Sequence, residues 1–239
     1  MRKLRWAEHT YAEIAERIKE KPLVILPVGS VEAHGHHLPL STDMIQPLWL
    51  AERIAERFNA LILPEIHYGW TESLASFPGT ISIGFDTLYL LVRDILTDVV
   101  ADGIDKILVL SGHASGNHMA ALRLACEEVN RENPHVRIML LSDYYIAYQY
   151  RGELVPEDDS HAGVIETSRV MAIRPELVTE DYHFEKRSTG RYMIVVDYSE
   201  IVPYATFSDP SGASRELGEK INERILEELT KIIKENFGI

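Results

Sequence analysis

Short runs of apolar residues alternate with longer amphipathic stretches along this chain. Apolar runs bounded by turn residues are typical of buried strands. Such runs occupy residues 22–28, 60–63, 106–111 and 136–141, and shorter candidates occupy residues 81–83 and 192–196. Helical spacing of apolar positions predicts helices over residues 43–58, 87–100, 117–130, 163–172 and 214–237. Strands that alternate with helices in this way predict a mainly parallel sheet with helices on both faces.

No repeat, low-complexity tract or linker-like break interrupts this pattern. We therefore expect residues 1–239 to form a single three-layer α/β/α domain. A chain of this length buries enough surface to fold without disulfides, and it has one cysteine, Cys126. Cys126 lies in a predicted helix, where we expect it to pack in the core.

Charge and hydropathy exclude several kinds of partner. The formal net charge of −13 disfavours nucleic acid, because phosphate binding needs clustered Lys and Arg. No run of about 18 apolar residues occurs, so we expect no membrane span. No apolar signal segment follows the charged first residues, and we expect a cytoplasmic protein with a small-molecule substrate.

The loop after the first predicted strand gathers acids and histidines. Glu32 and His34 are two residues apart, so in extended backbone they project to the same side. Asp43 opens the next helix, where its carboxylate can turn toward them or act only as a helix N-cap. Together they form a mixed oxygen and nitrogen set that suits Zn, Mn or Fe.

Two later segments supply more groups of the same kind. His113 directly follows the clearest strand, in a loop of small residues that lets the backbone approach a ligand. Asn117 is the expected N-cap of the next helix, and His118 is expected to be structural. Glu166 falls in the first turn of a predicted helix and can point back toward His161, or can simply cap that helix.

These segments lie at the carboxyl ends of strands or near them, where open α/β sheets bind ligands. The candidate metal ligands are Glu32, His34, Asp43, His113 and Glu166. Two divalent cations would be balanced by three carboxylates and a bridging hydroxide, with Asp43 as the bridging carboxylate. His161 is then the candidate proton shuttle, and Glu166 a second catalytic candidate.

Five sequence strings resemble the creatininase (creatinine amidohydrolase) family. They are LPVGSVEAHGHHLPLSTD at 26–43, FPGTIS at 77–82, SGHASGN at 111–117, HAGVIETS at 161–168 and SDPSGASRELG at 208–218. The resemblance implies a three-layer α/β fold, two divalent metals per chain, and a cytoplasmic homo-oligomer that is often a hexamer. It also implies hydrolysis of a cyclic amide or related bond, with metal ligands at Glu32, His34, Asp43 and His113 and the catalytic histidine at His161.

One departure concerns the second metal. Creatininases place a metal-binding Glu two residues after the histidine that matches His113, and this chain has Ser115 there. Glu166 is the candidate replacement. The tryptophans that close over creatinine are not evident, and a tyrosine-rich stretch at 143–150 fills that region. We expect substrate contacts at His37, Ser115, Tyr68 and Tyr145.

The expected activity is therefore hydrolysis of a cyclic amide or formamide by a two-metal amidohydrolase. Two relatives of the family offer other substrates: an archaeal deformylase of a formamidopyrimidine nucleotide and a keto-inositol hydrolase. From other classes, Ser115 could be the nucleophile of a serine hydrolase, although it lies one position late for that motif. A non-catalytic metal-binding protein is the remaining alternative.

Overall fold

The computed structural model describes residues 3–239, so the first two residues of the predicted domain lie outside it. The strands are β1 (Val24–Val28), β2 (Leu61–Ile62), β3 (Lys106–Ser111) and β4 (Arg137–Ser142). The α-helices are α1 (Tyr11–Lys19), α2 (Thr42–Phe58), α3 (Phe85–Ala101), α4 (Gly116–Glu132), α5 (Tyr144–Ala147), α6 (Val164–Ile173) and α7 (Arg215–Phe237). Short 3-10 helices span Trp6–Glu8, Glu72–Leu74, Tyr148–Tyr150 and Pro175–Leu177.

The four strands form one parallel sheet in the order β2-β1-β3-β4, which confirms the predicted α/β class. Val28 pairs with Ser111, and Ser111 pairs with Ser142, so three strands end at the same edge. From β1 the chain moves outward to β2 and then returns to place β3 on the other side. This reversal opens a crevice beyond the carboxyl ends of β1 and β3, the usual ligand position in such sheets.

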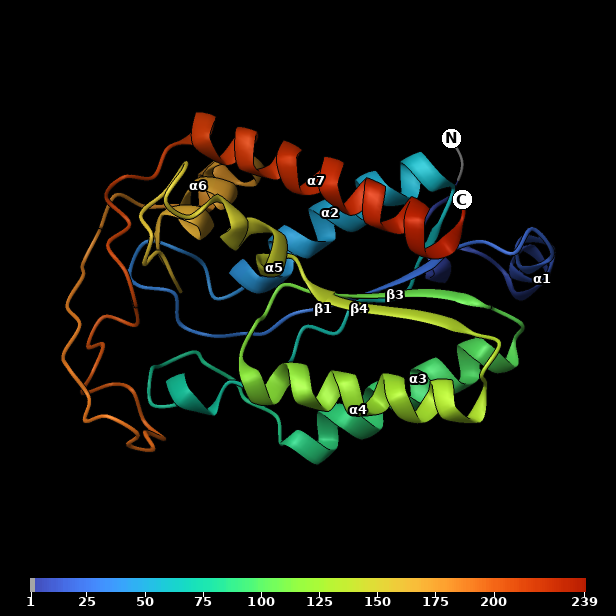
Figure 1. Ribbon diagram of the computed structural model, residues 1–239, viewed down its shortest axis with the longest axis horizontal. Coiled ribbons are helices and arrows are strands. Elements are labelled where there is room, and N and C mark those ends of the chain that lie inside the picture. Colours follow the sequence, from blue (N-terminus) through green and yellow to red (C-terminus); the bar gives the residue numbers. More distant parts are fainter. Residues whose placement is uncertain (1–2) are drawn as a thin grey trace.

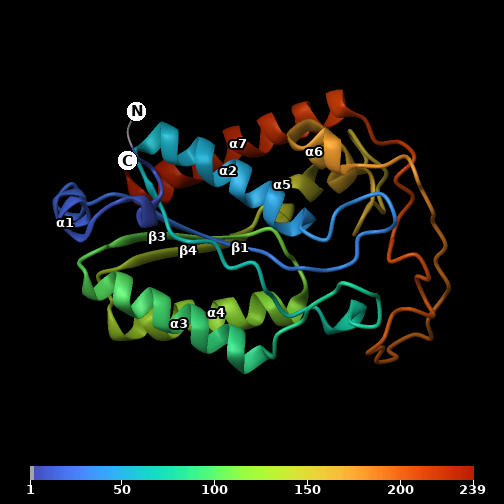
Figure 2. The ribbon, with the colours of Figure 1, turned by 180° about the vertical axis from the view of Figure 1, so that it is seen from behind.

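Helices cover both faces of the sheet, as Figure 1 and the reverse view in Figure 2 show. Helices α2, α5, α6 and α7 lie on one face, and α3 and α4 on the other. Alternate strand residues enter opposite cores, because successive side chains of a strand point to opposite faces. Ile25 and Leu108 belong to the core under α2 and α7, whereas Val24 and Val109 pack toward α3 and α4. The three-layer prediction is confirmed.

A buried ion pair joins α6 to the end of β4. Arg169 Nη2 lies 2.6 Å from Asp143 Oδ2, and both side chains are fully buried. Arg169 Nε also donates to Asn222 Oδ1 on α7 over 2.8 Å. The guanidinium therefore connects two helices and the residue after the edge strand β4.

The prediction of a strand at residues 192–196 is wrong. Tyr192 is 96% exposed and Ile194 88% exposed, and the described residues offer this segment no ladder partner. A strand needs a neighbour for its backbone groups, which a run of apolar residues alone does not provide. The candidate strand at 81–83 makes only isolated bridges, Val31 with Ile81 and Gly69 with Ser82.

No helix within residues 3–239 is both long enough and apolar enough to span a bilayer.

Candidate metal centre

The predicted ligands converge at the crevice beyond β1 and β3. Glu32 and His34 come from the loop after β1, and His113 comes from the loop after β3. Asp43 lies in the first turn of α2, and Glu166 lies in the first turn of α6. All five side chains are buried, with at most 7% of any residue exposed. Burial of so many ionisable groups requires that they compensate one another or bind cations.

Asp43 joins the two halves of this cluster. Its Oδ1 lies 3.1 Å from His34 Nε2, and its Oδ2 lies 2.9 Å from His113 Nδ1. Ser30 Oγ donates to Oδ2 over 2.7 Å, which fixes the carboxylate plane. The N-cap position of α2 belongs to Ser41, so the alternative role of Asp43 as the N-cap is wrong. A carboxylate with one imidazole on each oxygen is arranged as a bridging ligand would be.

Main-chain carbonyl groups orient the two imidazoles. His34 Nδ1 donates to the carbonyl oxygen of Glu32 over 3.0 Å, and His113 Nε2 donates to that of Trp70 over 3.0 Å. A carbonyl oxygen can only accept, so these nitrogens carry the hydrogen. His34 Nε2 and His113 Nδ1 are left facing Asp43, and this kind of outer hydrogen bond is typical of metal-ligating histidines.

Three overlapping groups of ligand atoms result. Glu32, Asp43 and His113 bring one atom each within 4.8 Å of the others, as do His34, Asp43 and Glu166. Glu32, His34 and His161 form the third group. At the 2.9–3.1 Å that separate these nitrogens from Asp43, a nitrogen lone pair cannot face a carboxylate oxygen directly, so a proton or a cation must lie between them. This donor set fits two divalent cations that share Asp43, of the kinds that bind mixed imidazole and carboxylate ligands.

Electrostatics of the cluster support the same conclusion. Burial disfavours the charged form of His34, but Asp43, Glu166 and Glu32 outweigh it and raise its pKa to about 10. Burial raises the pKa of Glu166 to about 7, although the His34 charge opposes this. Without cations the imidazoles hold protons among the carboxylates, and metal binding would displace those protons.

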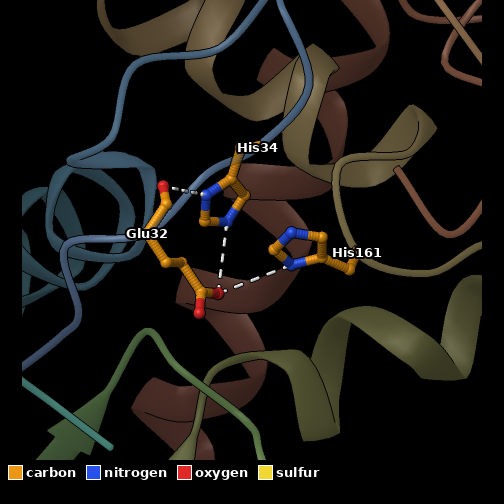
Figure 3. Close-up of side chains that lie close together, drawn as sticks. All are labelled: Glu32, His34 and His161. Carbon is orange, nitrogen blue, oxygen red and sulfur yellow. Dashed lines mark hydrogen bonds and ion pairs between the residues drawn. The ribbon is translucent and has the colours of Figure 1, made fainter. Parts of the chain in front are cut away.

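His161 differs from His34 and His113 in its contacts. Its Nε2 donates to the carbonyl oxygen of Ala33 over 2.9 Å, and its Nδ1 lies 3.5 Å from Glu32 Oε1. Figure 3 shows the rings of His34 and His161 converging on the Glu32 carboxylate. Burial and the charge of His34 lower the pKa of His161 to about 3, so its ring is neutral with a free lone pair on Nδ1.

The start of α6 places His161 and Glu166. Asp159, which sequence reasoning missed, caps the helix: its Oδ1 accepts from the Val164 N–H over 2.6 Å. Its Oδ2 accepts from the next N–H, over 3.1 Å. Glu166 Oε2 accepts from the Ala162 N–H over 2.6 Å while lying 3.5 Å from His34 Nε2. Glu166 thus acts both at the helix start and in the cluster, which the sequence offered as alternatives.

The cluster forms the floor of a cavity of about 650 Å³. Ser115, at the start of α4, lines this cavity and also holds the N-cap position expected for Asn117. His118 is structural as predicted, since its Nε2 contacts Ser111 Oγ at 3.1 Å.

Three predicted substrate contacts lie elsewhere. His37 is buried against Thr167 Oγ1 at 2.9 Å, outside the cavity wall. Tyr68 and Tyr145 are about half exposed and do not line the cavity either. Tyr144, at the start of α5, and Tyr148, in the 3-10 helix that follows, do line it.

Sequence reasoning missed several parts of the wall. They include Trp70, Glu72, Tyr148, Ile194 and Phe207. The i, i+4 spacing of Tyr144 and Tyr148 was a usable signal for one shared helix face. The others come from irregular segments, for which the chain carries no periodic signal.

Known proteins resemble this chain over nearly its whole length. The family model described as creatinine amidohydrolase matches residues 7–233. Creatinine amidohydrolase of Pseudomonas putida is 30% identical, covering 96% of each chain. A mycofactocin precursor peptide peptidase of Mycolicibacterium smegmatis is 32% identical over 67% of this chain and 61% of its own. A 3-dehydro-scyllo-inosose hydrolase of Thermotoga maritima is 24% identical over 76% and 60%.

Solved structures agree closely with the fold. A crystal structure of creatinine amidohydrolase superposes with a TM-score of 0.89, at 27% identity and 99% coverage of both chains. A mutant creatininase of Zn-Zn type and a creatininase with Mn each give 0.88, at 28% and 27% identity, again over 99% of both chains.

The fold, the imidazole and carboxylate cluster and these likenesses define a metal-dependent hydrolase. The creatininases of known structure carry zinc or manganese, and the present cluster is a candidate site of the same kind. The chain belongs to the creatininase family of amidohydrolases.

Proposed function

We propose that this protein is a two-cation amidohydrolase that cleaves a carbon–nitrogen bond, other than a peptide bond, in a small cyclic amide or formamide. One cation would bind Glu32, Asp43 and His113, and the other His34, Asp43 and Glu166. The observation that carries this proposal is Asp43, whose two oxygens face two imidazoles oriented by main-chain carbonyls. Bound there, the cations would supply Lewis acidity toward a carbonyl oxygen and lower the pKa of water.

His161 is the proposed proton carrier. It lines the cavity, and its Nδ1 lone pair points toward the ligand cluster while Nε2 is held by Ala33. A neutral imidazole so placed can accept a proton from the attacking water at Nδ1 and deliver it to the departing nitrogen. The ring is held on one side by His34, at 4.2 Å between centroids, and on the other by Phe207 at 5.4 Å.

Ser115 stands where creatininases have a metal-binding Glu, and Glu166 is the proposed replacement for that ligand. Its carboxylate lies 3.5 Å from His34 Nε2, within reach of the same cation. Ser115 Oγ instead donates to the Trp70 carbonyl oxygen over 3.4 Å. Among the described residues no imidazole bonds to this hydroxyl, so a serine nucleophile would lack its base. This geometry favours the metal mechanism over the serine alternative.

The cavity wall favours a neutral or cationic substrate. The described residues that line it include Glu72 beside the ligand carboxylates but no Lys or Arg. A phosphorylated nucleotide would therefore find no positive partner there, which disfavours the deformylase alternative. Trp70 provides a flat face, on which a small planar ring can stack. The creatinine amidohydrolase relative supports a cyclic amide of this kind.

We also propose that the whole chain acts as one domain within a cytoplasmic homo-oligomer. The resemblance to creatininases implies that this oligomer is a hexamer. Sedimentation at micromolar concentration tests the assembly, and a monomer would overturn it.

The activity is tested with purified protein and a panel of creatinine, other cyclic amides, formamides and a short peptide. Metal-dependent ring opening of a cyclic amide, or release of amine and formate from a formamide, abolished by chelation and restored by Zn²⁺ or Mn²⁺, is the expected result. Asp43→Asn should lose metal and turnover, whereas His135→Asn, which changes an exposed histidine far from the cluster, should retain both. Bound metal with no turnover on the panel would favour the non-catalytic alternative.

A further inference from the structure

A second group of metal-binding side chains lies on the surface, outside the buried cluster. His36 Nδ1 lies 3.3 Å from Asp181 Oδ2, and His183 Nε2 lies 2.9 Å from Asp181 Oδ1. One ligand atom from each of the three residues falls within 4.8 Å of the others. The side chains are 41–60% exposed, so water reaches all three. The arrangement repeats that of Asp43, a carboxylate with one imidazole on each oxygen.

Neighbouring groups hold these side chains in place. The ring of Tyr204 stacks on His183 at 4.9 Å with a 24° interplanar angle, and the His36 ring meets His183 edge-on at 4.9 Å. The Thr206 hydroxyl donates to the His183 carbonyl oxygen, and the Thr179 hydroxyl donates to that of His36. Two imidazoles and a carboxylate are thereby organised before any ligand arrives, which reduces the entropy lost on binding.

We propose that His36, Asp181 and His183 bind one divalent transition-metal ion, such as Zn²⁺, separate from the cations of the catalytic cluster. Imidazole nitrogens select Zn²⁺, Ni²⁺ or Cu²⁺ over Mg²⁺ and Ca²⁺, which prefer all-oxygen sites. Three protein ligands leave a coordination position for water. Exposure of the ligands makes this cation more readily exchanged than those of the buried cluster.

The position of this site gives the ion a structural consequence. His36 belongs to the loop that carries His34, whereas Asp181 and His183 begin the irregular segment 179–207. That segment contributes Ile194, Val195, Val196, Tyr198 and Phe207 to the cavity wall. An ion bound between the loop and the segment would fasten the wall of the cavity to the loop that holds the catalytic cluster.

The test is a zinc titration against a chromophoric chelator, starting from metal-free protein, for wild type and His183→Phe. Phenylalanine keeps a ring to stack on Tyr204 but has no ligand nitrogen, so the variant should bind one equivalent fewer. Asp181→Asn should weaken the same equivalent at least tenfold, while His135→Asn should bind as wild type does. Magnesium should not compete for this equivalent.

A second readout follows the segment itself. Trypsin cleavage at Lys186, Arg187 and Arg191 should slow when the last zinc equivalent binds, and should be insensitive to it in His183→Phe. Equal zinc stoichiometry in wild type and His183→Phe would overturn the proposal. The comparison measures a difference of one zinc equivalent and does not depend on whether the protein hydrolyses any amide. The surface zinc site and the proposed amidohydrolase activity can therefore fail independently.

Discussion

The contact between Gly112 and Asp43 links backbone packing to the metal centre. Gly112 follows β3, and its N–H donates to the Val28 carbonyl oxygen over 2.9 Å, so the sheet fixes its position. A Cβ built on Gly112 would lie 2.0 Å from the Asp43 carbonyl oxygen and 2.5 Å from Pro47 Cδ. Ordinary contact begins near 3.4 Å, so Gly112→Ala would require a displacement of about 1.4 Å. The atoms that would have to move belong to the first turns of α2.

The expected cost follows from this displacement. Overpacking of a close-packed interior costs about 1–3 kcal/mol of unfolding free energy, and the rigid backbone on both sides places this variant at the upper end. Metal ligands tolerate about 0.2 Å of error, so moving Asp43 by even a fraction of 1.4 Å should loosen both cations. We expect Gly112→Ala to lose most of its bound metal and at least 10²-fold in kcat/KM.

Elemental analysis after gel filtration, urea unfolding and the amide assay measure these effects. Gly212→Ala is the matched control, since a Cβ there makes only an ordinary contact of 3.5 Å with Val164 Cγ2, outside the cavity wall, and it should leave metal, stability and activity near wild type. If Gly112→Ala folds with full metal content and full activity, the reasoning that Asp43 is held by this contact is refuted.

Three further predictions address the proton carrier and the core. His161→Ala should keep its bound metal and lose about 10²–10⁴-fold in kcat, because a general acid–base group contributes that much; loss of metal would make His161 a ligand. Arg169→Met should lower the unfolding free energy by about 3–5 kcal/mol in urea titrations, because the buried Asp143 would lose its partner. Adding Asp143→Leu should recover most of that loss, and a double variant as unstable as the single one would contradict the ion-pair explanation. Burial raises the pKa of the Cys126 thiol to about 12, so a thiol reagent at pH 8 should label it only in denaturant. Rapid labelling of the native protein would show that α4 opens readily.

Much of the fold followed from the apolar runs, because strands buried on both faces are continuous and short. The metal cluster followed from topology, since loops after neighbouring parallel strands meet at one edge. The sequence also indicated that Glu166 lies in a first helical turn, where its side chain can reach back. These inferences depend on regular elements, whose periodicity fixes the direction of each side chain.

The cavity wall could not be predicted in the same way. Trp70 and Glu72 lie in a connection without periodicity, and the 192–196 segment lacks a strand neighbour despite its continuous apolar run. The register of a single helical turn decides which tyrosine ring faces the cavity, and the sequence does not show that register. Tyr145 was therefore favoured over Tyr148. Asp159 was missed because a cap two residues before His161 is indistinguishable in sequence from a solvated acid.

The main-chain hydrogen bonds to His34, His113 and His161 have a consequence for how such a protein changes over generations. Every residue type has a carbonyl, so substitution at Trp70, Ala33 or Glu32 does not by itself remove the acceptor that orients each ring. Side chains around the cavity can therefore be substituted, and the substrate specificity changed, while the imidazole rings keep their orientation. Such a scaffold supports diversification of specificity by point mutation, and it is most vulnerable to insertions or deletions that shift the loops themselves.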